Sequence, residues 1–348
     1  MERRLVLAAL GSNFLNDGPL TARFERRLAK LLGVRHVVAV TSGTSALFVS
    51  LAALGIGPGD EVLVPDVTFI ATANAVSLAG AEPVLVDVAP RTLTIAPAAA
   101  RRLVTRRTKA IIPMHLSGRA ADMKALARIA SAHRLAVVED AAEALGSKLG
   151  GRFLGTFGDA GCFSFTANKI ITSGQGGAIA TDDDALHRRL REVKDQGRPK
   201  RGTGGADEHV SIGYNFKYTD LQAAVALGQL GRLRGRNRRM RELREAYGRG
   251  LAGIRGIRPL PFQAGASPEW VDALAEDRDG LIGFLADHGV ECREFWHPLH
   301  SQRPYARPDA WFPVSARLVP QAFWLPSSFM MKDSDIARVC RLVRGYLA

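Results

Sequence analysis

Cysteine is scarce in this sequence, with three in 348 residues, at Cys162, Cys292 and Cys340. They lie far apart, are odd in number, and form neither a CxxC pair nor a cysteine–histidine spacing typical of zinc. This pattern argues against a disulfide framework, and we expect no metal site. Because disulfides are rare in reducing compartments, the default expectation is a cytoplasmic protein.

A hydrophobic run of transmembrane length is also lacking. The N-terminal stretch MERRLVLAALGSNF places an apolar run after basic residues. That run is too short for a normal signal-peptide core, and no convincing cleavage site follows it. We interpret the stretch as a helix fragment and expect no membrane partner.

Acidic residues are outnumbered, with 34 Asp and Glu against 47 Lys and Arg, which gives a net charge of +13. Arginines cluster in GRLRGRNRRMRELRE, residues 231–245, and such a patch could bind a polyanion. Aromatic residues are not interleaved with it, as a nucleic-acid platform would require. A solvated helix face is therefore favoured and no nucleic-acid partner is expected, although a basic protein suits a small anionic substrate such as a nucleotide.

Strand-like and helix-like segments alternate over the first two-thirds of the chain. Several strand candidates are continuous apolar, β-branched runs, typical of strands buried on both faces. The order predicts an α/β fold with a largely parallel sheet. Strands are predicted at 36–42, 61–69, 82–88, 109–116, 135–140, 161–165 and 177–182, and helices at 44–54, 71–80, 121–134 and 183–197.

The pattern changes near residue 200, where residues 200–215 are predicted to form a long loop followed by helix at about 219–252. Beyond it, DRDGLIGFLADHGV is typical of a helix and ECREFWHPLH of a strand running into a proline turn. DSDIARVCRLVRGYL is typical of a closing helix, with Ser334 or Asp333 as its N-cap. We predict a large α/β domain over 1–235 and a smaller α+β domain over 236–348.

Three features could carry chemistry. The Ser-Gly-Thr turn in AVTSGTSALF joins a strand to a helix, where N–H groups favour phosphate, but capping by Ser42 or Thr44 explains it equally well. Asp140 ends an apolar strand in VVEDAAEALGS. An acid at that place could contact a ligand, or it could be the N-cap of the next helix. Lys169 lies between two predicted strands, and a lysine removed from water becomes a nucleophile suited to a Schiff base. Most single lysines, however, lie on the surface.

Together the three features match the needs of pyridoxal phosphate (PLP): an amine, an acid for the ring nitrogen, and N–H donors for the phosphate. Six segments of the sequence extend this match: GPLTARFERRLAKLLGVRHVVAVTSGTSAL, GIGPGDEVLVPDVTFIATANAV, EDAAEALGS, FGDAGCFSFTANKIITSGQGG, GYNFKYTDLQAA and FWHPLH. Through them the sequence resembles the DegT/DnrJ/StrS family of nucleotide-sugar aminotransferases over nearly its whole length. EDAAEALG and the lysine segment most resemble the perosamine-synthase branch.

The resemblance implies the PLP fold type I, with a mostly parallel seven-stranded sheet covered by helices on both faces. It implies transamination of a keto sugar, a nucleotide-linked 4-keto-6-deoxyhexose, with glutamate as the amino donor. Lys169 would form the Schiff base and shuttle the proton, and Asp140 would keep the pyridine nitrogen protonated. Further implied contacts are Glu143 at the cofactor's 3-hydroxyl, Gly43, Thr44 and Ser164 at its phosphate, and Phe69 on its ring.

Asn215 would reach the phosphate of the neighbouring subunit's cofactor, which implies a homodimer with shared active sites. Lys217, His300 and the loop 199–209 are candidates for contacting the sugar nucleotide. Simpler local explanations are open for three residues: Phe69 as core, Ser164 as a strand hydroxyl, and Asn215 as an Asx-turn residue.

Two departures from the family pattern concern the substrate. Gln175 stands where relatives carry glutamate, and Gln196 stands where they carry histidine. The alternative functions are a PLP-dependent sugar dehydratase and a non-catalytic PLP-fold regulator. Dehydratases in the family replace the lysine with histidine, so the presence of Lys169 favours transamination.

Overall fold

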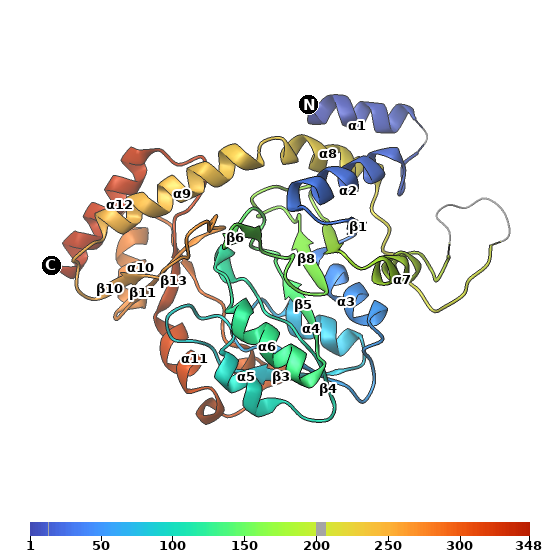
Figure 1. Cartoon of the computed structure of the whole chain (residues 1–348). Coiled ribbons are helices and arrows are strands. Elements are labelled where there is room, and N and C mark those ends of the chain that lie inside the picture. Colours follow the sequence, from blue (N-terminus) through green and yellow to red (C-terminus); the bar gives the residue numbers. More distant parts are fainter. Residues whose placement is uncertain (13, 200–206) are drawn as a thin grey trace.

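Seven strands form the central sheet of the computed structural model, which describes residues 1–12, 14–199 and 207–348 (Figure 1). The strands from β8 to β3 pair in parallel, whereas β9 runs antiparallel to both neighbours. The predicted seven-stranded, mostly parallel sheet is therefore confirmed. In spatial order the strands are β1 (His36–Val40), β9 (Gly177–Thr181), β8 (Ala160–Ser164), β5 (Ala136–Asp140), β4 (Thr108–Ile111), β2 (Glu61–Pro65) and β3 (Glu82–Val86).

Helices cover both faces of this sheet. Alternate residues of each strand point to opposite faces, so Val38 and Val40 pack with one set of helices, and Val37 and Ala39 with the other. One face carries α3 (Gly43–Ala53), α4 (Ala71–Leu78) and α7 (Asp184–Lys194). The other carries α2 (Pro19–Leu32), α5 (Pro97–Leu103), α6 (Met123–His133) and α8 (Asp220–Leu230).

The N-terminal stretch forms a helix, α1 (Glu2–Gly11), as predicted, and it packs along α8 on the outside of the molecule (Figure 1). Gly228 of α8 makes this close approach possible, because a methyl group there would lie 2.5 Å from the Glu2 side chain. Across the described ranges, no helix has both the length and the apolar character needed to cross a bilayer.

A second, antiparallel sheet lies in the C-terminal third, in the order β10 (Ile257–Pro259), β11 (Val271–Ala275), β13 (Ala322–Leu325) and β12 (Arg293–Glu294). Its core is shared with α9 (Leu233–Gly250), α10 (Arg278–Asp287) and α12 (Asp333–Leu347). The smaller elements are β6 (Lys148–Leu149), β7 (Arg152–Phe153), α11 (Pro313–Leu318) and the short 3₁₀ turns η1 (Leu116–Gly118), η2 (Leu299–Ser301), η3 (Arg303–Tyr305), η4 (Asp309–Trp311) and η5 (Val319–Gln321).

Helix α9 connects the two regions (Figure 1). Its early residues Leu233 and Met240 belong to the core around the central sheet, and its later residues Leu243 and Tyr247 belong to the core of the second sheet. The boundary at residue 235 stays a prediction.

Several local expectations differ from the structure. The strands predicted at 61–69 and 109–116 are shorter, since they end at Pro65 and Ile111. The helix predicted at 219–252 is divided into α8 and α9, and the strand predicted in ECREFWHPLH is reduced to two residues. The predicted N-cap of the last helix is wrong, because the helix begins at Asp333 and Lys332 occupies the cap position. There the Asp335 carboxylate accepts the Lys332 main-chain N–H at 2.8 Å. Part of the predicted loop, residues 200–206, lies outside the described residues.

Candidate active site

The carboxyl ends of β1, β5 and β8 border a cavity of about 440 Å³. In parallel sheets this edge collects the residues that follow each strand, so side chains distant in sequence meet there. The cavity brings together most of the residues singled out from the sequence. They are Gly43, Thr44, Phe69, Asp140, Glu143, Ser164 and Lys169.

The turn after β1 is built to leave N–H groups available. Ser42 caps α3, its hydroxyl accepting the Ser45 N–H at 3.0 Å while the Ser45 hydroxyl accepts the Ser42 N–H at 2.8 Å. Neither the Gly43 nor the Thr44 N–H donates to another residue that the structure describes. The capping and phosphate interpretations are thus compatible. Ser42 caps the helix, and the N–H groups of Gly43 and Thr44 stay available at the helix N-terminus, where anions bind.

Gly43 is required by the closeness of two chain segments. A methyl group at this position would lie 2.9 Å from the Ser164 Cβ atom. A real Cβ does not tolerate that separation, so the residue must be glycine for the turn to lie against the end of β8. This contact places the Ser164 hydroxyl beside the N-terminus of α3, where a phosphate group could receive it.

Lys169 lies in the loop between β8 and β9, and its side chain is 11% exposed. Its Nζ atom lies 3.5 Å from Glu143 Oε1 and 5.0 Å from the centroid of the Trp270 ring. The loop can fold back here because Gly177, at the start of β9, lies against the main chain of Ser42. The lysine is therefore withdrawn from bulk water and held at the cavity rather than on the surface.

Asp140 ends β5 and is buried. Its Oδ2 accepts the Thr72 hydroxyl at 2.7 Å and its Oδ1 accepts the Ala142 N–H at 3.1 Å. Burial raises the pKa of this carboxyl, and the Thr72 hydrogen bond opposes that shift. Turns rather than a helix follow Asp140, so the role of a helix N-cap is excluded. Among the described residues no cation forms an ion pair with its carboxylate, and a protonated ring nitrogen would supply that positive charge.

Glu143 faces Lys169 from the turn after β5. Its Oε2 accepts the Ser117 main-chain N–H at 2.8 Å. Burial raises the pKa of Glu143 to about 7, and the positive charge of Lys169 limits the rise. This carboxyl can therefore hold or release a proton near neutral pH next to the lysine.

Phe69 is not a core residue, since its side chain is 54% exposed and lines the cavity. Its ring centroid lies 5.9 Å from that of Trp296, with an angle of 49° between the planes. A planar group in the cavity could stack on such a ring.

Three predicted residues lie outside the cavity lining. Asn215 forms an isolated β-bridge with Asp195, and Lys217 Nζ lies 2.7 Å from Asp195 Oδ1. His300 is buried, with its Nδ1 atom 2.7 Å from Asp66 Oδ2. Their predicted roles stay predictions.

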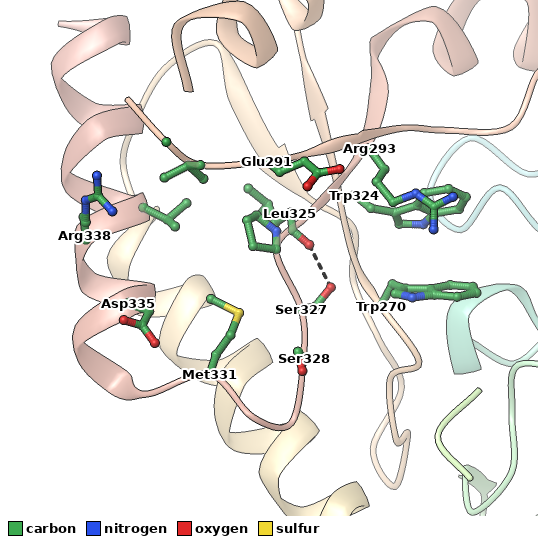
Figure 2. Close-up of a pocket in the computed structure, with 14 residues that line it drawn as sticks. Trp270, Glu291, Arg293, Trp324, Leu325, Ser327, Ser328, Met331, Asp335 and Arg338 are labelled. Atoms are coloured by element: carbon green, nitrogen blue, oxygen red, sulfur yellow. Dashed lines mark hydrogen bonds between the residues drawn. The ribbon is translucent and has the colours of Figure 1, made fainter. Parts of the chain in front are cut away.

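The second sheet and the segments next to its strands contribute cavity residues that the sequence reasoning missed, namely Trp270, Trp296, Trp324 and Arg293. One signal was available, because the chain has only four tryptophans and three of them meet here. Figure 2 shows Arg293 beside the Trp324 ring, with Trp270 nearby, at one end of a second cavity of about 550 Å³. These three residues therefore form a wall shared by the two cavities. Gln175 also lines the first cavity, whereas Gln196 does not.

Comparisons with known proteins show which family the chain and its fold resemble. A model described as the DegT/DnrJ/EryC1/StrS aminotransferase family matches residues 1–344. GDP-perosamine synthase of Caulobacter vibrioides is 40% identical over 88% of this chain and 84% of its own length. GDP-perosamine synthase of Vibrio cholerae is 32% identical, over 99% and 96%. The crystal structure of S. venezuelae DesV with a ketimine intermediate matches with a TM-score of 0.94 at 34% identity, over 99% of this chain and 94% of DesV.

Proposed function

This chain belongs to the DegT/DnrJ/EryC1/StrS aminotransferase family, and from that premise we propose that it transfers the amino group of glutamate to a nucleotide-linked 4-keto-6-deoxyhexose. It is a PLP-dependent sugar aminotransferase of amino-sugar biosynthesis. The observation that carries the proposal is the meeting of Lys169, Asp140 and the turn at Gly43 around one cavity.

The residues around the cavity fit PLP. When bound, the cofactor supplies an aldehyde that takes up the amino group and a ring that delocalises negative charge. Lys169 would bind at the aldehyde carbon, and the unpaired carboxylate of Asp140 would hold the ring nitrogen protonated. The N–H groups of Gly43 and Thr44 and the Ser164 hydroxyl would bind the phosphate, and Phe69 would stack on the ring.

The chain's own residues then manage protons and water. The Nζ atom of Lys169 would take up a proton from the amino donor and release it again within the site, and it would do the reverse in the second half-reaction. Glu143, within 3.5 Å of that atom, stabilises its charged form. The wall formed by Trp270, Trp324 and Arg293 borders the cavity on the side of the second sheet and would limit the access of water.

Arg293 is the residue we propose for the carboxylate of the amino donor. Among the described residues, Lys169 and Arg293 are the cations that line the cavity, and Lys169 is committed to the cofactor. No carboxylate of the described chain forms an ion pair with Arg293. A guanidinium group left free at a cavity wall is suited to binding a substrate carboxylate in a bidentate manner.

The homodimer with shared active sites belongs to the same proposal. Asn215 and Lys217 lie away from this chain's cavity, which fits a role toward the cofactor and nucleotide of the neighbouring subunit. His300 also has a structural role. Its main-chain N–H and its ring both bind the Asp66 carboxylate, and these contacts hold the segment after Trp296 against the end of β2. A cytoplasmic location is supported by the free state of Cys162, Cys292 and Cys340.

The test is incubation of the purified, PLP-loaded protein with glutamate and a panel of nucleotide-linked keto sugars, followed by mass analysis. We expect an aminated sugar nucleotide and 2-oxoglutarate in equal amounts. A dehydrated sugar formed without consumption of glutamate would favour the dehydratase alternative. A protein that binds PLP but forms neither product would favour a non-catalytic regulator.

A further inference from the structure

The arginine-rich segment of residues 231–245 has no part in the mechanism above. Most of it lies in α9, and the structure separates its arginines into two groups. Arg234 and Arg238 are exposed, and they match the solvated helix face expected from the sequence. Arg236, between them in the sequence, is partly buried against the loop that carries Lys169, so it needs a separate explanation.

The guanidinium group of Arg236 makes three contacts with other segments of the chain. Its Nη1 atom donates to the main-chain carbonyl of Ile170 at 2.8 Å and to Gln229 Oε1 of α8 at 2.6 Å. Its Cζ atom lies 4.4 Å from the centroid of the Phe329 ring. No acidic residue that the structure describes forms an ion pair with it. Arginine suits this place because its planar group can stack on a ring while its N–H groups donate sideways.

The carbonyl that Arg236 binds lies in the lysine loop, residues 165–176 between β8 and β9. The base of this loop is closed by its own main chain, since the N–H of Phe165 donates to the carbonyl of Gly176 at 2.8 Å. Within the described chain, Arg236 is the one side chain from outside the loop that donates to a main-chain carbonyl of residues 166–171. It therefore restrains the part of the loop that the closed base leaves free.

A second side chain binds the same residue from the side of the second sheet. The main-chain N–H of Ile170 bonds to the carboxylate of Glu269, which is buried just before β11. The N–H of Glu269 in turn donates to the carbonyl of Ser117 at 3.0 Å. Both main-chain groups of Ile170 are thus bound, one by Glu269 and the other by Arg236. Because Lys169 directly precedes Ile170, these bonds fix the main chain from which the lysine side chain extends.

The lysine side chain depends on this support because its own contacts are long. The Nζ atom of Lys169 lies 3.5 Å from Glu143 Oε1 and 5.0 Å from the centroid of the Trp270 ring. Neither distance is that of a strong hydrogen bond, so the position of the amine follows the position of the main chain. For a reacting group, a displacement of about 1 Å can cost roughly 100-fold in rate.

We propose that Arg236 is a positioning residue, which holds the main chain at Ile170 so that the Nζ atom of Lys169 stays at the cavity. Arg236 does not line that cavity, so it acts through the lysine and not on a substrate. The catalytic consequence rests on the proposed function, because a lysine that binds the cofactor and moves a proton must be placed accurately.

The first test measures hydrogen–deuterium exchange in the cofactor-free protein, read from the peptide that spans residues 166–171. Arg236→Met removes the donors and keeps a long side chain. We expect exchange of this peptide to become about tenfold faster, because the loss of a bond from a charged group favours local opening. Arg238→Met is the matched control on the same helix, since Arg238 is exposed and its ion pair with Glu242 is 3.9 Å long. Equal exchange in the two variants overturns the proposal.

The second test adds PLP to the cofactor-free protein and measures how fast Lys169 captures it, by borohydride trapping and mass analysis of the labelled peptide. We expect the rate to fall about tenfold in Arg236→Met, less than the full cost of a 1 Å displacement, because Glu269 still binds Ile170. Arg236→Lys keeps the charge and a donor but cannot stack in the same way, so its rate should be intermediate. The lysine variant also replaces Arg236→Met should that one fail to fold.

A purely structural role gives a different result. If Arg236→Met lowers the thermal stability but leaves exchange of residues 166–171 and capture of PLP as in Arg238→Met, Arg236 only packs α9 and the proposal is wrong. In active enzyme we expect kcat of Arg236→Met to fall about tenfold at an unchanged KM for glutamate, because the substrate contacts stay intact while the lysine is displaced.

The two proposals fail in distinguishable ways. A wild-type protein in which Lys169 captures no PLP would refute the proposed function, and the exchange experiment would still decide whether Arg236 positions the loop. An active aminotransferase in which Arg236→Met matches Arg238→Met in exchange, capture and kcat would refute the role of Arg236 alone.

Discussion

The two sheets contribute to one cavity in different ways. The central sheet supplies Asp140, Ser164 and the turn at Gly43 from the ends of its strands, and these groups suit the cofactor. The second sheet and the segments next to it supply three tryptophan rings and Arg293, and these groups suit a substrate. Under the proposed function, cofactor binding and substrate handling would be built on separate cores and would meet at Lys169.

The largest effect is expected from Asp140→Asn, on the cofactor side. The amide cannot balance a protonated ring nitrogen, so we expect kcat/KM to fall by roughly 100- to 1,000-fold, or about 3–4 kcal/mol. Steady-state kinetics with glutamate checks this, with Thr72→Val as the graded comparison that removes only the hydroxyl bonded to Asp140. Equal losses in the two variants would contradict the assigned role of the charge.

On the side of the second sheet, Arg293→Gln should raise KM for glutamate by roughly 10- to 100-fold while leaving the affinity for PLP unchanged, since one charged contact is worth about 1.5–3 kcal/mol. Arg258→Gln is the matched control, because Arg258 is an exposed arginine of β10 in the same sheet and lines neither cavity. Loss of PLP from Arg293→Gln would contradict the assignment of cofactor binding to the central sheet and of substrate binding to the second sheet.

Gly43→Ala should weaken PLP binding by about fivefold to 100-fold, because the added methyl group pushes the turn away from Ser164 and the resulting strain costs about 1–3 kcal/mol. KM for glutamate measured in saturating PLP should change little. Gly235→Ala is the control, since no atom lies within 4 Å of its added methyl group and alanine favours helix α9. Equal PLP affinity in both variants would contradict the proposal that the turn at Gly43 binds the phosphate.

The smallest effect concerns stability against pH in the cofactor-free protein. Glu143 and Glu269 have pKa values of about 7 and about 8 in the folded state, above the ordinary value of 4.5. The folded state therefore binds more protons than the unfolded state between about pH 4.5 and 8, and the contribution of these groups to stability falls as the pH rises through that range. Thermal unfolding at several pH values should show a flatter dependence in the Glu143→Gln/Glu269→Gln double variant, and an identical slope would contradict the raised pKa values.

The same comparison explains what the sequence could predict. The strands and the groups at their ends were predictable because a buried β-branched run, a capped turn and a helix are encoded within about ten residues. Lys169 and Asp140 were singled out in this way, and the resemblance to the family gave them their expected roles. Trp270 and Glu269 were not, because their positions depend on the pairing of β11 with β13 and on the contact of Glu269 with Ser117, more than 150 residues away along the chain. No local pattern encodes such contacts.

Lys169 gives the most direct test of the account. We predict that the PLP-loaded wild type has a visible absorbance that glutamate bleaches, whereas Lys169→Ala, with an unchanged fold, lacks the lysine-bound absorbance and turns over at least about 100-fold more slowly, since the proton shuttle alone is worth about 10²–10⁴. Full turnover by Lys169→Ala, measured as aminated sugar formed per enzyme, would contradict the proposal that this lysine binds the cofactor and moves the proton.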